Sequence, residues 1–265
     1  MIKLIATDMD GTLLNNKGQL PKNFFNILNK LNSKNIIFVA ASGRPYYTLE
    51  NNFEEEKDKV YFVAENGAVI MHGGNELFSK FLDKKIVNDI IEDSKKLNHC
   101  HLVLCAEHKA YIQSTKKEFI TEVEKYYHNY DIVDSLNKVS DDIVKISIYD
   151  FEGSLENSYL KLDPKWKEAA LITVSGKNWL DIGRTDVNKG EAIKFLQNKF
   201  NISEMETMVF GDNFNDIHML QSAYYSYVME NAPEEVKKYG RFTAESNDDE
   251  GVVRVIEDKI LEKYV

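Results

Sequence analysis

The chain has 265 residues, 43% of them hydrophobic, and its 33 Lys and Arg against 43 Asp and Glu give a formal net charge of −10. This length and apolar content suffice for one large domain or two smaller ones. The acidic balance argues against nucleic acid and anionic membranes as main partners, because both select clustered Lys and Arg.

The start of the chain and its cysteines favour a soluble protein. The first residues run directly into a predicted strand without the basic and apolar segments of a signal peptide, and no stretch reaches the roughly eighteen apolar residues of a membrane span. Cys100 and Cys105 are too few for a disulfide framework and lack the spacing of a zinc site. We therefore expect a cytoplasmic protein without a membrane partner.

In chain order, short apolar runs at 2–7, 36–41 and 60–64 predict buried strands, and an apolar stripe over 24–31 predicts a helix between the first two. This alternation predicts a parallel sheet. The polar turn at 15–18 has hairpin chemistry, so we expect a small flap over the edge of the sheet.

The same alternation returns near the end of the chain. We predict helices at 188–200 and 217–223, strands at 207–210 and 225–228, and a closing helix with Val252, Val255, Ile256 and Ile260 on its apolar face. Asn231 and Pro233 predict one further helix, with Asn231 as its cap and Gly240 at its end.

Residues 83–183, called the insert below, have a different pattern. Strands at 143–149 and 170–174 and helices at 86–97 and 118–127 predict an α+β unit. We therefore expect an α/β protein whose doubly wound, Rossmann-like parallel-sheet core, residues 1–82 and 184–265, is interrupted by the insert.

Two carboxylates, Asp8 and Asp10, stand where the first predicted strand ends, and Gly11 follows them. Ligands of open α/β sheets collect at the carboxyl ends of the strands. Because Gly11 suggests that the backbone turns there, the two acids need not share one role, and a nucleophile beside a proton donor fits them. A calcium loop is excluded because Thr12 and Gln19 stand where it needs other ligands, whereas a plain polar turn stays open.

Ser42 and Gly43 follow the second predicted strand. The hydroxyl of Ser42 and the flexible backbone at Gly43 are suited to donating hydrogen bonds to an anion. An ordinary turn is the alternative that remains open here.

Lys189 lies in the first turn of the helix after the insert, behind an Asn188 cap and ahead of Glu191. The helix dipole disfavours a cation in that place, which suggests that Lys189 neutralises an anion. The alternative is that Lys189 is exposed to solvent, where its unfavourable interaction with the helix dipole would be nearly zero.

Asp212, Asn215 and Asp216 follow the strand at 207–210. Carboxylate and amide oxygens are hard ligands of the kind that Mg²⁺ takes. A calcium loop is again excluded, because Phe214 stands where a ligand is needed.

Together, these separated stretches resemble the four motifs of the haloacid dehalogenase superfamily. The residues concerned are Asp8, Asp10, Gly11 and Thr12, then Ser42, then Lys189, then Gly211, Asp212, Asn215 and Asp216. The stretches 42–45, 65–68 and 246–251, with an insert placed before the lysine motif, more narrowly resemble the Cof-type phosphatases of that superfamily.

The resemblance implies that the Asp8 strand is central, between the strands that end at Ser42 and Asp212, and that the insert is a cap of the C2B type. It implies that Asp8 attacks phosphorus and forms an aspartyl-phosphate. Asp10 would protonate the leaving group and then activate water, and Thr12 would brace the loop that aims Asp10.

The resemblance also implies a cofactor, Mg²⁺, held by Asp8, the backbone carbonyl of Asp10 and Asp212, with Asn215 or Asp216 at the metal or supporting it. Ser42, Gly43 and Lys189 would bind the phosphoryl oxygens, with Asn215 as a further phosphate-binding residue. Arg44, Glu65 and Asn66 would form a substrate loop.

We therefore expect a Mg²⁺-dependent phosphatase that hydrolyses a small phosphorylated metabolite, a sugar phosphate or a phosphorylated cofactor, as a monomer or homodimer. One alternative is a sugar phosphomutase or phosphotransferase on the same scaffold. Another is a non-catalytic regulatory binding protein, which the complete set of motif residues disfavours. Trp166, Trp179 and the tyrosines of the insert are expected either to line the substrate pocket or to pack against the insert's own sheet.

Overall fold

The computed structural model describes residues 1–261, except for the side chains at positions 54 and 55. Within those residues, eight strands form one sheet in the order β14-β13-β12-β1-β2-β3-β4-β5. They are β1 (Leu4–Asp8), β2 (Ile37–Ala41), β3 (Val60–Ala64), β4 (Val69–His72), β5 (Asn75–Ser79), β12 (Thr207–Gly211), β13 (Tyr225–Met229) and β14 (Phe242–Ala244). A second sheet of six described strands has the order β10-β11-β9-β6-β7-β8. These are β6 (Cys100–Ala106), β7 (Ala110–Ile112), β8 (Tyr130–Ile132), β9 (Ile143–Asp150), β10 (Leu171–Val174) and β11 (Trp179–Gly183).

Helices cover both sheets. The α-helices are α1 (Phe24–Ser33), α2 (Tyr46–Glu50), α3 (Lys84–Ser94), α4 (Lys117–Glu124), α5 (Leu160–Trp166), α6 (Lys189–Phe200), α7 (Ile217–Leu220), α8 (Glu234–Lys237) and α9 (Gly251–Ile256). Short 3₁₀ turns are η1 (Glu54–Lys59), η2 (Glu65–Gly67), η3 (Leu136–Lys138), η5 (Glu204–Glu206), η6 (Phe214–Asp216) and η7 (Asn247–Asp249), and π-helical turns are η4 (Ser154–Tyr159) and η8 (Glu257–Leu261). None of the described helices is both long and apolar enough to cross a membrane.

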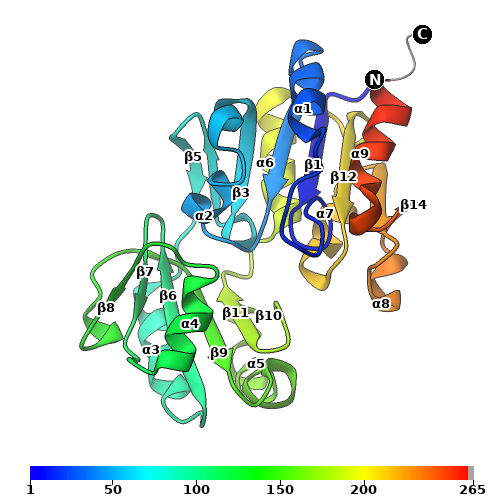
Figure 1. Ribbon diagram of the computed structural model, residues 1–265. Helices are drawn as coiled ribbons and strands as arrows, with labels where there is room; N and C mark the ends of the chain where they lie inside the picture. Colours follow the sequence, from blue (N-terminus) through cyan, green and yellow to red (C-terminus); the bar gives the residue numbers. More distant parts are fainter. Residues whose placement is uncertain (262–265) are drawn as a thin grey trace.

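The strand that ends at Asp8 lies in the middle of the first sheet, as expected. β1 runs parallel to β2 on one side, with Asp8 beside Ala41, and parallel to β12 on the other, with Thr7 beside Phe210. All 5 residues of β1 are buried, which explains why this strand reads as a nearly unbroken apolar run. The carboxyl ends of β1, β2 and β12 therefore meet at one edge, which faces the insert in Figure 1.

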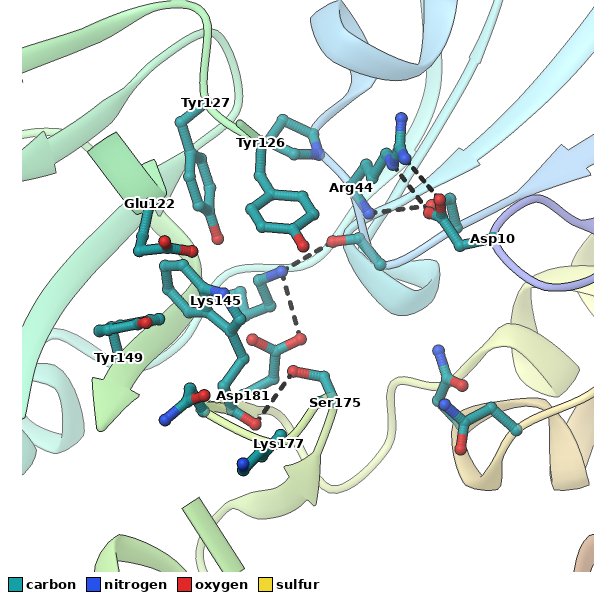
Figure 2. A pocket seen from close by; sticks show the side chains of 18 of the residues that line it. Asp10, Arg44, Glu122, Tyr126, Tyr127, Lys145, Tyr149, Ser175, Lys177 and Asp181 are labelled. Carbon is teal, nitrogen blue, oxygen red and sulfur yellow. Dashed lines mark hydrogen bonds and ion pairs between the residues drawn. The ribbon is translucent and has the colours of Figure 1, made fainter. Parts of the chain in front are cut away.

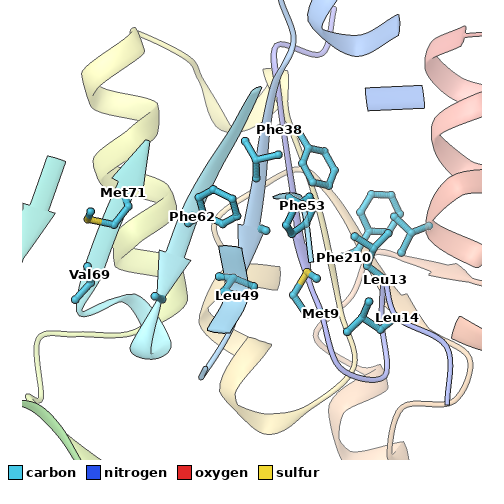
Figure 3. Packing of buried hydrophobic residues seen from close by; sticks show 14 of the residues in the cluster. Met9, Leu13, Leu14, Phe38, Leu49, Phe53, Phe62, Val69, Met71 and Phe210 are labelled. Carbon is cyan, nitrogen blue, oxygen red and sulfur yellow. The ribbon is translucent and has the colours of Figure 1, made fainter. Parts of the chain in front are cut away.

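The first sheet is doubly wound, with a helical layer on each face. Side chains alternate along β1, so that Ile5 packs with α1, α2 and α9, whereas Leu4 and Ala6 pack with α6, α7 and α8. On the face of the sheet that carries Ile5, the rings of Phe24 and Phe38 pack edge to face with their centroids 5.3 Å apart. Figure 3 shows the apolar cluster around Phe38, Phe53 and Phe62. The predicted α/β class, with a parallel-sheet core and an α+β insert, is confirmed.

The insert sheet has two unlike faces. On β9 and β11, Ile146, Ile148 and Leu180 pack with helices α3 and α5. The alternate positions therefore face the other way, and on β9 these are Lys145 and Ser147, which are nevertheless buried. That face lies toward the core.

The chain crosses between the two sheets at two neighbouring places. Arg184 donates from Nη1 to the carbonyl oxygen of Phe81 at 3.1 Å, and Lys80 pairs with Asp186 at 2.7 Å. These contacts tie the outgoing and returning segments together. The domain boundaries at 82/83 and 183/184 stay a prediction.

Three local expectations need correction. The turn at 15–18 forms, with Gly18 N donating to Asn15 O at 2.8 Å and Asn15 N donating to Gln19 O at 3.0 Å, but the described residues beside it form no pair of hairpin strands, and the one isolated bridge nearby joins Asp10 and Leu14, which both precede the turn. The predicted cap of α8 is wrong, because Pro233 occupies that position and the Asn231 side chain bonds elsewhere. The predicted closing helix is α-helical only over α9, and the π-helical turn η8 follows it.

Gly190 is expected to be essential for the packing of α6 against the segment of α7. A Cβ atom at Gly190 would lie 2.3 Å from the backbone oxygen of His218, so Gly190→Ala should lower the free energy of unfolding by about 1–3 kcal/mol despite alanine's better helix propensity. Urea denaturation measures this change. Lys194→Ala, at an exposed position of the same helix, is the control and should change stability by less than about 0.5 kcal/mol; equal stability of the two variants would contradict the close contact.

Candidate active site

A buried lysine joins two of the predicted carboxylates. Lys189, in the first turn of α6, is 0% exposed and donates from Nζ to Oδ1 of Asp8 and, at 2.7 Å, to Oδ1 of Asp216. Asn188 caps the helix by accepting from the Glu191 amide at 3.0 Å, as predicted. The structure therefore excludes the solvent-exposed alternative for Lys189.

Three carboxylates meet beside that lysine. One oxygen each from Asp8, Asp212 and Asp216 lies within 4.8 Å of the others. Asp216 also accepts from the backbone N–H groups of Asp212 and Asn213, both at 3.0 Å, and Thr12 donates to Asp212 Oδ1 at 2.7 Å. Both oxygens of Asp216 are thus engaged, which suits it to support the cluster, while Asp8 and Asp212 retain more capacity to bind a ligand.

Burial and mutual repulsion raise the proton affinity of this cluster. Burial, followed by the neighbouring Asp216, raises the pKa of Asp8 well above its ordinary value, and Lys189 only partly offsets this effect. The same two causes raise the pKa of Asp212 to about 7. Burial alone would lower the pKa of Lys189, but Asp216 and Asp8 more than compensate and raise it. A group of hard oxygen donors with unbalanced negative charge fits a small divalent cation such as Mg²⁺.

The Asp10 carboxylate lies outside this cluster. It accepts from Nε of Arg44 at 2.8 Å and also from Nη2, in the two-pronged geometry that fixes a carboxylate plane. Its side chain is 52% exposed and lines the pocket. The Thr12 hydroxyl bonds Asp212, whereas Arg44 holds the Asp10 side chain, and the role of Thr12 as a brace of the loop that aims Asp10 stays a prediction.

The predicted phosphate-binding residues lie at the same edge. Ser42 Oγ accepts from the Arg44 amide at 3.1 Å, and Ser42 and Gly43 line the pocket. Asn215 also lines the pocket, but its amide donates to Asn66 Oδ1 at 3.0 Å. The structure thus brings Asp8, Asp10, Ser42, Gly43 and Asn215 to one cavity, whereas Lys189 is fully buried beside Asp8.

A pocket of about 450 Å³ lies between the core and the insert (Figure 2). Its insert wall consists of Glu122, Tyr126, Tyr127, Lys145, Tyr149, Ser175, Gly176, Lys177, Asn178, Trp179 and Asp181. Trp179 is the centre of an aromatic group, with ring centroids 5.0 Å from Tyr149 and 5.8 Å from Tyr126. Trp166, in contrast, donates from Nε1 to Asp93 at 3.1 Å and is not part of this wall.

The predicted substrate loop connects the two walls. Asn66 donates to Asp181 Oδ2 at 3.1 Å, and Glu65, with a positive φ of 51°, pairs with Lys145 at 2.7 Å. Sequence reasoning did not identify Lys145 or Asp181. A usable signal was present, because the alternation along 143–150 places Lys145 and Ser147 on one face of a strand whose other face is apolar.

Two asparagines that the sequence analysis did not assign to the site, Asn231 and Asn247, hold the loop after Asp10. Asn231 Nδ2 donates to the Gly11 carbonyl at 2.8 Å, and Asn247 Nδ2 donates to the Leu14 carbonyl at 2.9 Å. Asn247 N also donates to Asn231 Oδ1 at 3.1 Å. Asn247 belongs to the 246–251 stretch, so that stretch supports the loop after Asp10.

Comparisons with known proteins agree with this geometry. The haloacid dehalogenase-like hydrolase family matches residues 5–256. The Escherichia coli protein 5-amino-6-(5-phospho-D-ribitylamino)uracil phosphatase YbjI is 32% identical over 262 residues, which cover 98% of this chain and 96% of that protein. Phosphatase YwpJ of Bacillus subtilis is 26% identical, with 96% of this chain and 99% of that one covered. The crystal structure of SMU.1108c from Streptococcus mutans has a TM-score of 0.90 and 32% identity, with 97% of this chain and 98% of that chain covered.

The chain belongs to the haloacid dehalogenase superfamily, since both the family match and the relatives extend over nearly its whole length. Within that superfamily it is a Cof-type phosphatase, that is, a phosphoric monoester hydrolase. The expectation drawn from the separated motifs is confirmed at this level.

Binding of Mg²⁺ is expected to stabilise the fold through the three carboxylates. At a Mg²⁺ concentration about a hundred times Kd, linkage adds about 2.7 kcal/mol to the free energy of unfolding, and Asp212→Asn should remove most of this gain. Thermal unfolding with MgCl₂, against NaCl of equal ionic strength, measures the effect. If the Tm of the wild type is the same with and without Mg²⁺, the metal assignment is contradicted.

Asn247→Ala is expected to loosen the loop that carries Asp10. We expect kcat to fall about tenfold with little change in KM, because misplacing a catalytic group by a fraction of an ångström has effects of this order. Steady-state kinetics on a phosphate monoester tests this, with the exposed Asn26→Ala in α1 as the control. A change confined to KM would show that Asn247 does not act through the loop.

Proposed function

We propose that this phosphatase uses Mg²⁺ and hydrolyses the phosphate monoester of a small metabolite through an aspartyl-phosphate on Asp8. The observation that supports this most strongly is the buried Lys189 shared by Asp8 and Asp216, at the edge where Asp212 completes the acidic cluster. The insert would act as the cap over the pocket.

Asp8 is the proposed nucleophile. Lys189 occupies its Oδ1 and so orients the carboxylate, and one carboxylate oxygen attacks phosphorus while the bond from phosphorus to the leaving oxygen breaks. Mg²⁺, when bound by Asp8 and Asp212 with the Asp10 carbonyl, would offset the negative charge of nucleophile and phosphoryl group. Ser42, Gly43 and Lys189 would stabilise the phosphoryl oxygens by hydrogen bonds and charge.

Asp10 is the proposed acid and base. It would give its proton to the leaving oxygen and later take one from the water that cleaves the acyl-phosphate, which frees Asp8 and phosphate. The pair with Arg44 would hold the carboxylate at the pocket wall. Exposure of half of the Asp10 side chain leaves water access to this position, which favours hydrolysis over the mutase or phosphotransferase alternative.

For the substrate, we propose a monophosphate with a polar and planar leaving group. The aromatic group around Trp179 offers flat surfaces, and Glu122 and Lys177 on the same wall offer hydrogen-bond partners for a ring. The name of the Escherichia coli relative gives a first compound to assay, 5-amino-6-(5-phospho-D-ribitylamino)uracil. A sugar phosphate and pyridoxal 5′-phosphate complete the test panel.

Asp8→Asn is expected to lower kcat at least about a thousandfold on every substrate of that panel, because an amide cannot form the covalent intermediate. Release of inorganic phosphate with Mg²⁺ measures the loss, and circular dichroism verifies the fold. Asp89→Asn, at an exposed position of α3, is the matched control and should retain full activity. Substantial turnover by a well-folded Asp8→Asn would refute the nucleophile assignment, and no turnover by the wild type on a broad panel would refute the proposed reaction.

A further inference from the structure

Lys145 of the insert reaches into the core. Its side chain is 4% exposed, and Nζ lies 2.7 Å from the Gly43 carbonyl oxygen, 2.7 Å from Glu65 Oε2 and 3.4 Å from Asp181 Oδ2. Figure 2 shows the lysine extending from the insert toward the loop that carries Arg44. Of these partners, Gly43 and Glu65 belong to the core.

The sequence around Lys145 places it there by strand alternation. Ile146 and Ile148 pack beneath the insert helices, so Lys145 and Ser147 face the core. Ser147 donates to Asp181 Oδ1 at 2.6 Å, which fixes the carboxylate beside the lysine. Burial alone would lower the pKa of Lys145, but Asp181 and Glu65 more than compensate and raise it, so the amine stays charged.

This arrangement is costly for a contact that serves stability alone. Buried ion pairs seldom stabilise a fold more than apolar residues of similar volume do. Glu65 adopts a positive φ of 51°, and its buried Oε1 lacks a hydrogen-bond partner among the described residues. Backbone strain of this kind persists where the surrounding structure enforces it, often at functional sites.

The loop 42–44 explains what the contact achieves. All three of its carbonyl groups are held: Ser42 O by the Asn66 amide at 3.0 Å, Arg44 O by the Glu65 amide at 3.0 Å, and Gly43 O by Lys145. The outer two donors are backbone groups of η2 in the core. Only the middle donor comes from the insert.

The peptide between Gly43 and Arg44 is therefore fixed on both sides. Its carbonyl accepts from Lys145, and its N–H donates to Ser42 Oγ at 3.1 Å. Because Ser42 Oγ is engaged as an acceptor there, its own proton remains for another acceptor, and Ser42 lines the pocket. The next side chain, Arg44, holds Asp10.

We propose that Lys145 is a positioning residue that the insert supplies to the phosphate-binding loop, where it orients the Gly43–Arg44 peptide and through it Ser42 and Asp10. This inference rests on the proposed function. Turnover would then require the insert to be seated on the core, whatever the leaving group of the substrate.

The test compares Lys145→Met with the wild type. We expect kcat to fall about ten- to a hundredfold, by the same factor for p-nitrophenyl phosphate, ribose 5-phosphate and pyridoxal 5′-phosphate, because the lysine acts on the loop and not on the leaving group. Combining Lys145→Met with Ser42→Ala should give less than the product of the two single losses, since part of the effect of Lys145 acts through the Ser42 hydroxyl. Lys109→Met, on the insert surface where Lys109 pairs with Asp131, is the control for removal of a lysine.

A second variant separates positioning from charge balance. Lys145→Met with Glu65→Gln removes both charges of the pair, so it avoids the unpaired buried carboxylate at Glu65 that destabilises the single variant. We expect this double variant to fold and to remain impaired. Recovery of wild-type activity would show that Lys145 only neutralises Glu65 and would overturn the proposal, as would a loss confined to one leaving group or full independence from Ser42→Ala.

Calorimetric titration with inorganic phosphate in the presence of Mg²⁺ keeps this inference apart from the proposed reaction. The folded double variant should bind phosphate several-fold more weakly than the wild type. If the wild type hydrolyses none of the esters but phosphate binding still depends on Lys145, the proposed reaction fails and the positioning role stands. Equal phosphate affinity in both proteins would overturn the positioning role.

Discussion

Repulsion among Asp8, Asp212 and Asp216 is the force that the rest of the site has to balance. These carboxylates approach within 4.8 Å of one another, and Lys189 supplies one positive charge, which it shares between Asp8 and Asp216. With all three acids ionised, two negative charges remain uncompensated. That remainder equals the charge of one divalent cation. Without such a cation, protonation reduces the excess negative charge, as the raised pKa values of Asp8 and Asp212 indicate. Placement of the lysine inside the first turn of α6, against the helix dipole, follows from this balance.

The close approach of the three carboxylates also constrains the backbone around them. Gly11 has a φ of 81°, and a Cβ atom there would lie 2.5 Å from Asp212 Oδ2, so a side chain at this position would push Asp212 away from its place. The loop after Asp10 is then held by Asn231 and Asn247, which come from beyond β13 and β14. Contacts from three distant residues, Asp212, Asn231 and Asn247, thus keep the loop after Asp10 in the conformation that brings the carboxylates together.

Sequence reasoning predicted what is encoded locally. The strand that ends in Asp8, the Asn188 cap with its lysine, and the group of Asp212, Asn215 and Asp216 can all be read from a few neighbouring residues, because strand ends and helix caps have short signatures. The predicted order of the central strands and the fold class are confirmed, and the assignment of catalytic roles stays a prediction.

Contacts between distant segments could not be predicted. Asn231 has every local mark of a helix cap, yet its amide bonds Gly11, 220 positions away in the sequence. The pairing of Arg44 with Asp10 depends on how the loops after two neighbouring strands fold, and the contact of Lys145 with Gly43 depends on how two sheets face each other. A single sequence does not state either geometry. Alternation along β9 marked Lys145 as unusual but not as a partner of the core.

The pairing of β1 with β12 also constrains the order in which the molecule can form. Residues 4 and 207 are neighbours in the sheet, so during synthesis the central strand waits for most of the chain before its second neighbour exists. The insert has its strands close together in sequence, and contacts between near positions form fastest. A nascent chain that has released the insert but not β12 therefore leaves the edge of β1 that pairs with β12 open, and its Asp8 still lacks Asp212. A partial chain that ends before β12 consequently lacks two of the three carboxylates of the acidic cluster, which is among the last parts of the protein to be assembled.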